Sequence, residues 1–192
     1  MLALAKAKAE VKKLDNIDFR VADMLDLGSP DASFDAVVCA FGIFFVPDMT
    51  AAIKELWRMV KPGGRLAITT WGPDLFEPAN SAFWHVIGNV RPDLQRSFIH
   101  ERISKPSGLR ELFAEANIDI QTDYILAESG THALNSPDDW WAIAMGSGYR
   151  GTLAQLDAET VERVRIANLS CLHREQVKSI NTNVVYAVAT KR

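Results

Sequence analysis

The pattern that most constrains the fold lies in residues 34–71. An unbroken apolar run at 36–40 predicts a strand that is covered on both faces. Asp48 can cap a following helix whose apolar residues fall on one face. The string at 61–64, Lys-Pro-Gly-Gly, ends that helix and turns the chain into a second strand at 66–71. Strand, helix, turn and strand in this order predict a βαβ unit with two parallel strands.

The rest of the chain also alternates helices with strands. Residues 2–14 predict a helix, and the apolar alternation at 17–22 predicts a strand with one solvated face, as at a sheet edge. Further helices are predicted at 80–90, from Pro106 to 116, from Ser136 (as a capping serine) and from Asp157 to 173, and further strands at 118–124 and 184–189. This order predicts an α/β, doubly wound sheet, in which ligands bind beyond the carboxyl ends of the strands.

Length and composition fit one domain over residues 1–192. Hydrophobic residues make up 48% and charged residues 23%, so a core can form, and the net charge of −3 includes no block that favours nucleic acid. No apolar run is long enough for a membrane span, and lysines interrupt the N-terminus, so a signal peptide is not expected. Cys39, in an apolar run, is expected as a buried free thiol, the cytoplasm is the default compartment, and no metal-ligand spacing is present.

The residues after the predicted strands are the candidates for ligand binding. The carboxylate of Asp23 could accept a hydrogen bond from an adenine amino group, and the backbone N–H of Met24 could serve a ring nitrogen. The plainer alternative is that Asp23 only begins a turn. Gly42 would allow a close approach of the backbone to a ligand, and Phe41 or Phe45 could wall an apolar pocket, unless both belong to the core.

Four strings together resemble class I S-adenosylmethionine-dependent methyltransferases, most closely those that methylate quinones and other small metabolites. They are Asp23, Ser-Phe-Asp-Ala-Val-Val at 33–38, Phe-Val-Pro-Asp at 45–48 and Leu-Trp-Arg-Met-Val-Lys-Pro-Gly-Gly-Arg-Leu at 56–66. The resemblance is clear over residues 1–71 and general beyond. It implies a Rossmann-like, mostly parallel sheet of strand order 3-2-1-4-5-7-6 with an antiparallel seventh strand. It also implies S-adenosyl-L-methionine as cofactor, bound by Asp23, Met24, Ala40 and Phe41.

This sequence departs from the family at its N-terminal side. The family's first two strands, its glycine-rich turn and its ribose-binding acid would all precede the helix at 2–14. We therefore expect an N-terminally truncated domain without the glycine-rich binding loop, from a misassigned gene start or a truncated gene. The strands at 17–22 and 36–40 would lose their partners, at about 1–3 kcal/mol for each unpaired buried group.

Methyl transfer from a sulfonium is an in-line displacement that depends mainly on alignment of the reactants. His85, His100, Tyr149 and His173 are candidate bases, although a structural role is the plainer reading of each, and none is assigned as catalytic. Residues 39–42 lack an (Asp/Asn)-Pro-Pro-(Tyr/Phe) string, which argues against amino-group methylation of nucleobases or glutamine. The segments 72–105 and 127–181 are the predicted substrate cover, and their aromatic residues suit an apolar or aromatic small-molecule acceptor, if they are not simply core.

Two other readings stay open. The chain could be an inactive remnant that acts as a binding module or as a homodimer through open sheet edges, which calorimetry with S-adenosylmethionine would distinguish. A nucleotide-dependent dehydrogenase shares the fold class, but its glycine fingerprint is not seen either. The enzyme reading requires that the strand ends marked by Asp23, Phe41 and Trp71 line a common crevice.

Overall fold

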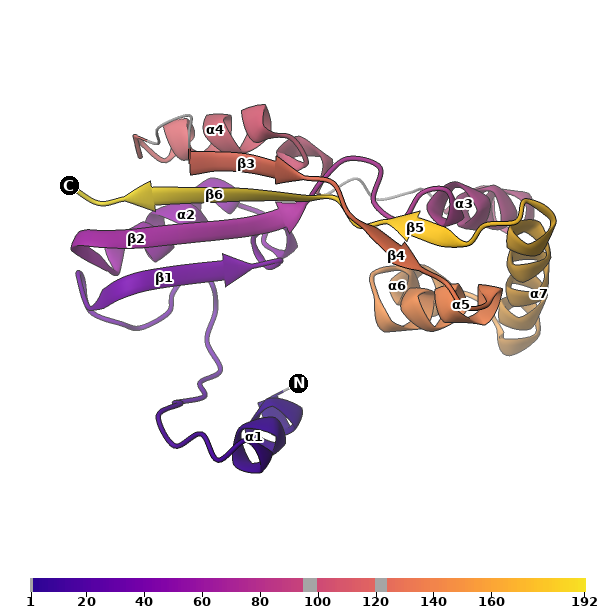
Figure 1. Ribbon diagram of the computed structural model, residues 1–192, viewed down its shortest axis with the longest axis horizontal. Helices are drawn as coiled ribbons and strands as arrows, with labels where there is room; N and C mark the ends of the chain where they lie inside the picture. The colour runs from indigo at the N-terminus through magenta and orange to yellow at the C-terminus, as the bar shows by residue number, and fades with distance from the viewer. Residues whose placement is uncertain (1, 95–99, 120–123) are drawn as a thin grey trace.

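A four-stranded mixed sheet forms the centre of one half of the molecule (Figure 1). The computed structural model describes residues 2–94, 100–119 and 124–192. In spatial order the strands are β1 (Phe34–Ala40), β2 (Val60–Trp71), β6 (Val184–Thr190) and β3 (Ile125–Glu128). β1 and β2 are parallel, whereas β6 runs antiparallel to both of its neighbours. The predicted α/β class with an antiparallel C-terminal strand is confirmed, and the order matches the family's strands four, five, seven and six.

The predicted βαβ unit forms as expected. β1 leads through the 3-10 turn η1 (Ile43–Phe45) into α2 (Met49–Arg58), whose N-terminus is capped by the Asp48 carboxylate, which accepts the Ala51 N–H at 2.8 Å. β2 begins earlier than predicted, at Val60. Because Phe34 pairs with Val60 and Ala36 pairs with Arg65, the intervening Lys-Pro-Gly-Gly string bulges out of the ladder.

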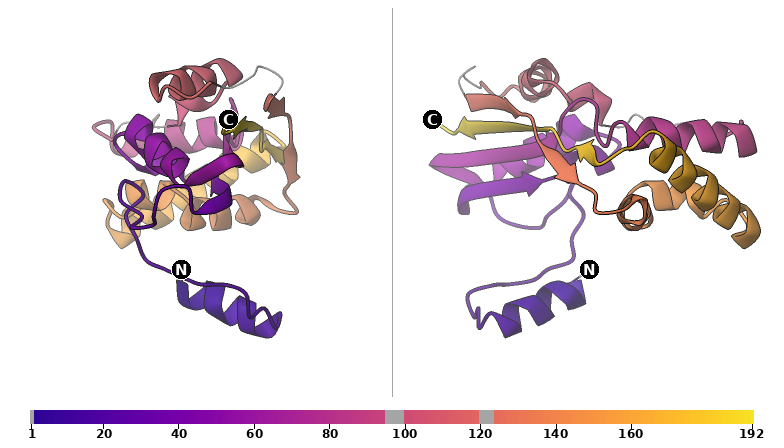
Figure 2. Two further views of the ribbon diagram at one scale, coloured as in Figure 1. Left: turned by 90° about the vertical axis from the view of Figure 1, so that its left-hand side faces the viewer. Right: turned by 45° about the vertical axis from the view of Figure 1, so that its right-hand side comes forward.

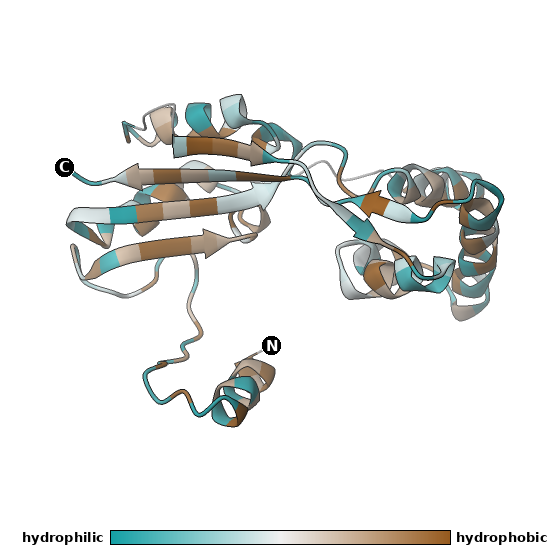
Figure 3. Ribbon diagram, in the orientation of Figure 1, coloured by the Kyte–Doolittle hydropathy of each residue, from teal (hydrophilic) through white to brown (hydrophobic). Residues whose placement is uncertain are grey.

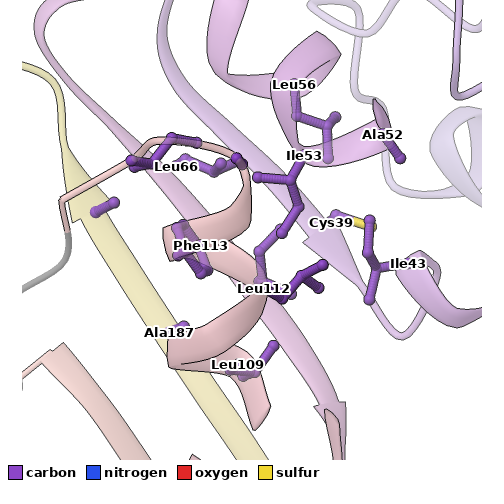
Figure 4. Packing of buried hydrophobic residues seen from close by; sticks show 14 of the residues in the cluster. Cys39, Ile43, Ala52, Ile53, Leu56, Leu66, Leu109, Leu112, Phe113 and Ala187 are labelled. Atoms are coloured by element: carbon purple, nitrogen blue, oxygen red, sulfur yellow. The ribbon is translucent and has the colours of Figure 1, made fainter. Parts of the chain in front are cut away.

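Helices α2 and α4 (Pro106–Glu115) cover one face of the sheet. Cys39, Leu66 and Ala187 point from the sheet into this layer, where they meet Ile53 of α2 and Leu112 of α4 (Figure 4). All of these side chains are buried. The layer holds the carboxyl ends of β1 and β2 in a fixed position. The short helix η2 (Glu101–Ile103) precedes α4 and buries Ile103 beneath it.

The other half of the molecule is a helical unit with its own apolar cluster around the buried Trp140. It contains α3 (Ala79–Val90), β4 (Thr131–Ala133), α5 (Pro137–Gly146), α6 (Tyr149–Leu153), α7 (Ala158–Arg174) and β5 (Ser179–Asn181). β4 and β5 pair antiparallel, and the chain continues from β3 into β4 and from β5 into β6, so a two-stranded ribbon joins this unit to the sheet (Figure 1). The predicted cover segments 72–105 and 127–181 thus both contribute to one unit.

Residues 17–22 do not form the predicted strand. This stretch has no regular structure and pairs with no strand within the described residues, and Ile17 and Val21 are 43% and 86% exposed. Alternating apolar and polar residues suit a strand with one buried face, but a strand is stable only beside a partner strand with which it exchanges hydrogen bonds. The preceding helix α1 (Leu2–Val11) ends three residues earlier than predicted and lies apart from the sheet (Figures 1 and 2).

The prediction that both faces of β1 are covered is wrong. Val37 and Cys39 face the α2 layer, but Ala36, Val38 and Ala40 are exposed on the other face. β1 is an edge strand here: within the described ranges it pairs with β2 alone. Its apolar sequence therefore remains largely uncovered, as the brown band along β1 in Figure 3 illustrates.

Three smaller predictions have mixed outcomes. Ser136 precedes α5, but its side chain makes no capping hydrogen bond, and the Asp139 carboxylate instead accepts the Asn135 N–H at 2.7 Å. Asp157 caps α7 as predicted by accepting the Thr160 N–H. The strand predicted at 118–124 falls partly outside the described residues, and the observed strand, β3, begins at Ile125. Among the described helices, none is long and apolar enough to cross a membrane.

Candidate functional site

The carboxyl ends of β1 and β2 lie side by side and carry two aromatic rings in contact. The Phe41 N–H donates to the Thr69 carbonyl at 2.9 Å, which extends the parallel ladder to the last residue before the loop. There the backbone of Phe41 turns into the left-handed region with φ +51°. Its ring centroid lies 4.2 Å from that of Trp71. A strained backbone at a strand end thus aims an aromatic side chain across the top of the sheet.

The loop that carries Asp23 approaches the same place. A Cβ on Gly42 would lie 3.3 Å from Cε of Met24, so these two residues are in close contact. Asp23 is exposed, and its Oδ1 accepts the Leu25 N–H at 2.9 Å. This is the turn geometry of the plainer interpretation. Met24 therefore lies beside Gly42, the residue after Phe41, while Asp23 forms the turn that precedes it.

An ion pair anchors this loop to α2. Arg58 donates to the Ser29 carbonyl at 2.8 Å and to the Asp31 carboxylate at 2.5 Å, and it also pairs with Glu55. Glu55 in turn accepts the Leu27 N–H at 3.1 Å. The Arg58 guanidinium, through its hydrogen bonds, lowers the pKa of Glu55 below its usual value. The ionised pair therefore holds the loop that places Met24.

Cys39 lies directly beneath the loop after β1. Its thiol is buried, and burial raises its pKa, although backbone contacts from Gly42 and Ile43 act in the opposite sense. A Cβ on Gly42 would lie 3.2 Å from the Cys39 sulfur. The expectation of a buried free thiol is met. Gly42 is small because the backbone passes close to both Cys39 and Met24.

A series of aromatic rings continues from the strand ends into the helical unit. The Trp71 ring lies 5.9 Å from that of Phe76, and Phe76 lies 5.8 Å from Trp140 and 6.3 Å from Tyr149. Tyr149 donates from its hydroxyl to Asn80 Oδ1 at 2.8 Å. These spacings are those of interacting aromatic pairs. The rings of the sheet and of the helical unit therefore form one continuous series of packed aromatic side chains.

The backbone is closely packed where the chain passes from Trp71 of the sheet toward the helical unit. Gly72, which follows Trp71, donates its N–H to the Asn183 carbonyl at 2.6 Å, and a Cβ on Gly72 would lie 2.7 Å from Asn183 Cβ. The Asn183 amide donates to the Pro73 carbonyl and its Oδ1 accepts the Gly130 N–H. One asparagine thus ties β2 to both strands of the connecting ribbon and holds Trp71 in position.

The four candidate bases fall in different places. His85 and His173 are exposed on α3 and α7. His100 packs its ring 6.2 Å from Phe44, next to the turn after β1. Tyr149 belongs to the aromatic series, with its hydroxyl bonded to Asn80. Of the four, Tyr149 is the one that the structure places in the aromatic series that begins at the strand ends.

Two further predicted residues, Ala40 and Phe45, lie outside the aromatic series. Ala40 is exposed on the uncovered face of β1. Phe45 is 76% exposed and its ring contacts that of the buried Phe44, with the centroids 4.7 Å apart, so it does not wall a pocket with Phe41. The chain holds one Gly-x-Gly string, at 146–148, which joins α5 to α6. It follows a helix and not a strand, so it lacks the context of a phosphate-binding or nucleotide-binding turn.

Two polar residues beside the aromatic series were not singled out from the sequence. The Asn80 amide donates to the Glu77 carboxylate at 2.7 Å and so orients the oxygen that receives the Tyr149 hydroxyl. Asn80 is 3% exposed. A buried asparagine in the first turn of a helix otherwise rich in apolar residues is the signal that could have indicated it, since buried amides require partners.

Comparisons with known proteins find similarity to methyltransferases. Residues 1–68 match the model of the methyltransferase domain family. The chain is 47% identical over 83 residues to the demethylmenaquinone methyltransferase of Deinococcus radiodurans, which covers 43% of this chain and 32% of that protein. It is 28% identical over 117 residues to the ubiquinone/menaquinone biosynthesis C-methyltransferase UbiE of Cronobacter sakazakii, covering 60% of this chain and 45% of that protein.

Solved structures agree on the fold. A protein described as a methyltransferase from Bacillus halodurans superimposes with a TM-score of 0.58 at 16% identity, over 99% of this chain and 78% of that one. The YcgJ protein from Bacillus subtilis does so with a TM-score of 0.53 at 18% identity, over 100% and 78%. The matched segments span about a third to under half of the two curated relatives.

Proposed function

Residues 1–68 of this chain belong to the methyltransferase domain family, and its sheet has the class I, S-adenosylmethionine-dependent methyltransferase fold; on this premise we propose that the strand-end surface serves methyl transfer to a planar, apolar small molecule of the quinone type. The observation that carries the proposal is the ring contact between Phe41 and Trp71 at the carboxyl ends of two parallel strands, with Met24 beside the adjacent Gly42. In doubly wound sheets this edge is where ligands bind.

The residues present fit the adenine and methionine parts of S-adenosylmethionine. The exposed Asp23 carboxylate and the Met24 backbone would receive the adenine edge, and Ala40, Phe41 and the small Gly42 would line the methionine part. The cofactor supplies an electrophilic methyl group on a sulfonium. The Gly-x-Gly string between α5 and α6 supplies no backbone cradle at this edge, so we expect affinity to depend on the strand-end residues.

The aromatic series supports the choice of acceptor class. Trp71 and Phe76 are both partly exposed where β2 leads into the helical unit, and a flat conjugated ring could stack on aromatic side chains at this position. The Tyr149 hydroxyl, oriented by Asn80, is a polar group on this surface that could engage a carbonyl or hydroxyl oxygen. The two curated relatives are named for acting on quinones or their precursors, which agrees with such an acceptor.

In this arrangement the chain's own residues position and shield the reactants. The Glu55–Arg58 pair fixes the loop of Met24, and the Asn183 contacts fix Trp71. Apolar rings exclude water from the line between donor and acceptor. Alignment of this kind accounts for much of the rate of a displacement reaction, and no residue is assigned as a general base.

Isothermal titration of the full chain with S-adenosylhomocysteine tests the cofactor part. We expect saturable binding that Asp23→Asn weakens several-fold and Phe41→Ala weakens further. Asp35→Asn is the matched control because Asp35 is exposed at the opposite end of β1. Absence of binding, or equal losses in the Asp23 and Asp35 variants, would count against the proposal. Binding without turnover of a demethylated quinone would favour the alternative of an inactive binding module.

A further inference from the structure

The phenol ring of Tyr149 is enclosed by other aromatic side chains of the helical unit. Its centroid lies 4.8 Å from that of Phe83, 5.3 Å from Trp140, 6.3 Å from Phe76 and 6.4 Å from Trp84. These four side chains form an aromatic cage. Phe83 and Trp140 are fully buried, whereas Tyr149 itself is partly exposed. The cage therefore holds a phenol ring that solvent can still reach.

A buried hydrogen-bond acceptor receives the hydroxyl group of this phenol. The Tyr149 hydroxyl donates to Asn80 Oδ1 at 2.8 Å, and Asn80 is 3% exposed. The Asn80 amide nitrogen donates to the Glu77 carboxylate at 2.7 Å, and the second oxygen of that carboxylate accepts the Ser81 N–H at 3.0 Å. Because a carboxylate only accepts hydrogen bonds, the amide oxygen of Asn80 must face Tyr149. This end of the site thus selects a hydroxyl donor.

The segment that carries Tyr149 is short and follows two glycines. Helix α6 has five residues, and the Gly-Ser-Gly string at 146–148 joins it to α5 (Figure 1). A Cβ on Gly146 or Gly148 would meet nothing within 4 Å, and neither residue has a left-handed backbone. Close packing and a left-handed backbone are the usual reasons for a glycine, and neither applies at this joint. What glycine supplies here is freedom of φ and ψ, as a hinge requires.

We propose that Tyr149 occupies the binding site of the acceptor, and that α6 swings about residues 146–148 to exchange Tyr149 for an aromatic ring that carries a hydroxyl group. Such a ligand offers the cage a ring and offers Asn80 a hydrogen-bond donor, as Tyr149 does. The cage begins at Phe76, whose ring lies 5.9 Å from that of Trp71, so the site adjoins the strand ends. Once released from Asn80, the Tyr149 hydroxyl can engage a second oxygen of the acceptor. The inference rests on the proposed function and adds to it the place where the acceptor binds.

Fluorine NMR of small probes tests the site with the full chain and needs neither cofactor nor turnover. The probe is 4-fluorophenol, which resembles the tyrosine side chain, and fluorobenzene is the matched probe without the hydroxyl group. We expect saturable line broadening of 4-fluorophenol by the parent chain and markedly weaker binding of fluorobenzene, because fluorobenzene leaves the buried Asn80 oxygen without a donor.

Two variants change the exchange in opposite directions. Apparent affinity falls with the fraction of molecules in the binding-competent state, so Tyr149→Ala, which needs no opening, should bind 4-fluorophenol about tenfold more tightly. Gly148→Pro should weaken binding several-fold while raising the melting temperature. Gly148 has φ −58° and Ser147 before it is extended, at φ −126° and ψ −166°, so proline fixes the joint as observed. Gly88→Ala on α3 is the control: it also adds stability but leaves the joint unchanged, and its affinity should equal that of the parent chain.

Asn80→Leu tests the polar end and should abolish the preference for 4-fluorophenol over fluorobenzene. If this variant fails to fold by circular dichroism, the same preference measured in Tyr149→Ala replaces it. Binding by Tyr149→Ala but not by the parent chain, equal affinities of Gly148→Pro and the parent chain, or equal affinities for the two probes would overturn the proposal. Titration with S-adenosylhomocysteine fails separately, since loss of cofactor binding alone counts against the proposed function and not against exchange at Tyr149.

Discussion

The ring of Phe41 lies 4.2 Å from the ring of Trp71 and is held there by a left-handed backbone with φ +51°. A residue with a Cβ pays for this conformation, whereas glycine adopts it freely. The contact between the two strand ends is therefore maintained against local strain, and the strain can be measured separately from the ring contact.

Phe41→Gly and Phe41→Ala both remove the ring, but only the alanine variant keeps the strain. We expect Phe41→Gly to be more stable than Phe41→Ala by about 1 kcal/mol in urea unfolding, the reverse of the usual order of these residues near a strand. Both should be less stable than the parent chain because the Trp71 contact is lost. An alanine variant at least as stable as the glycine variant would show that the left-handed backbone is not retained.

Gly72 and Gly88 form a matched pair of glycines. A Cβ on Gly72 would meet the Asn183 backbone carbon at 2.9 Å, whereas a Cβ on Gly88 in α3 would meet nothing within 4 Å. We expect Gly72→Ala to destabilise the protein strongly and to move Trp71, seen as a changed tryptophan fluorescence. Gly88→Ala should stabilise it by roughly 0.5–1 kcal/mol, since alanine favours the helix. Similar melting temperatures for the two variants would contradict the close approach at Gly72.

Trp140 is fully buried in the helical unit and donates from Nε1 to Asn168 Oδ1 at 2.7 Å. Trp140→Phe leaves a cavity and an unpaired amide oxygen, and we expect a loss of about 2–4 kcal/mol in the free energy of unfolding.

The double variant Trp140→Phe/Asn168→Leu should recover part of this loss. The buried Asn168 Nδ2 already has no hydrogen-bond partner within the described residues, so leucine removes an unsatisfied donor as well as the orphaned acceptor. A double variant less stable than Trp140→Phe alone would mean that the hydrogen bond contributes little.

The pKa of Glu55 is lowered by its hydrogen bonds with Arg58. A carboxylate with a lowered folded-state pKa contributes stability that is fully present above its unfolded value near 4.5 and is lost as the pH falls through the folded value. Glu55→Gln should therefore reduce the urea midpoint at neutral pH, and its difference from the parent chain should shrink below pH 4.5. A difference that does not change with pH would show that the amide loses packing and not charge.

Local sequence patterns determined the elements whose partners are close along the chain. The cap at Asp48, the stripe of α2 and the apolar runs on either side of it specify a βαβ unit almost by themselves, because a short connection leaves the two strands one parallel arrangement. Asp157 and α7 are predictable for the same reason, since a cap and a helical period are local properties. The contact between Phe41 and Trp71 followed from the rule that parallel strands end at one edge, whereas the position of Met24 did not, because residues 17–22 form no strand.

Tertiary structure decided what depends on partners distant in sequence. The alternation at 17–22 predicts a strand, yet this stretch pairs with no strand among the described residues. The apolar run of β1 predicts a strand covered on both faces, yet one face is exposed. Pairing and burial both require a neighbouring segment that no local pattern can supply. Phe76 packs against Tyr149, and Gly72 lies against Asn183. Both contacts arise only when segments distant in sequence meet. A sequence specifies which surfaces are apolar, and the folded chain specifies what covers them.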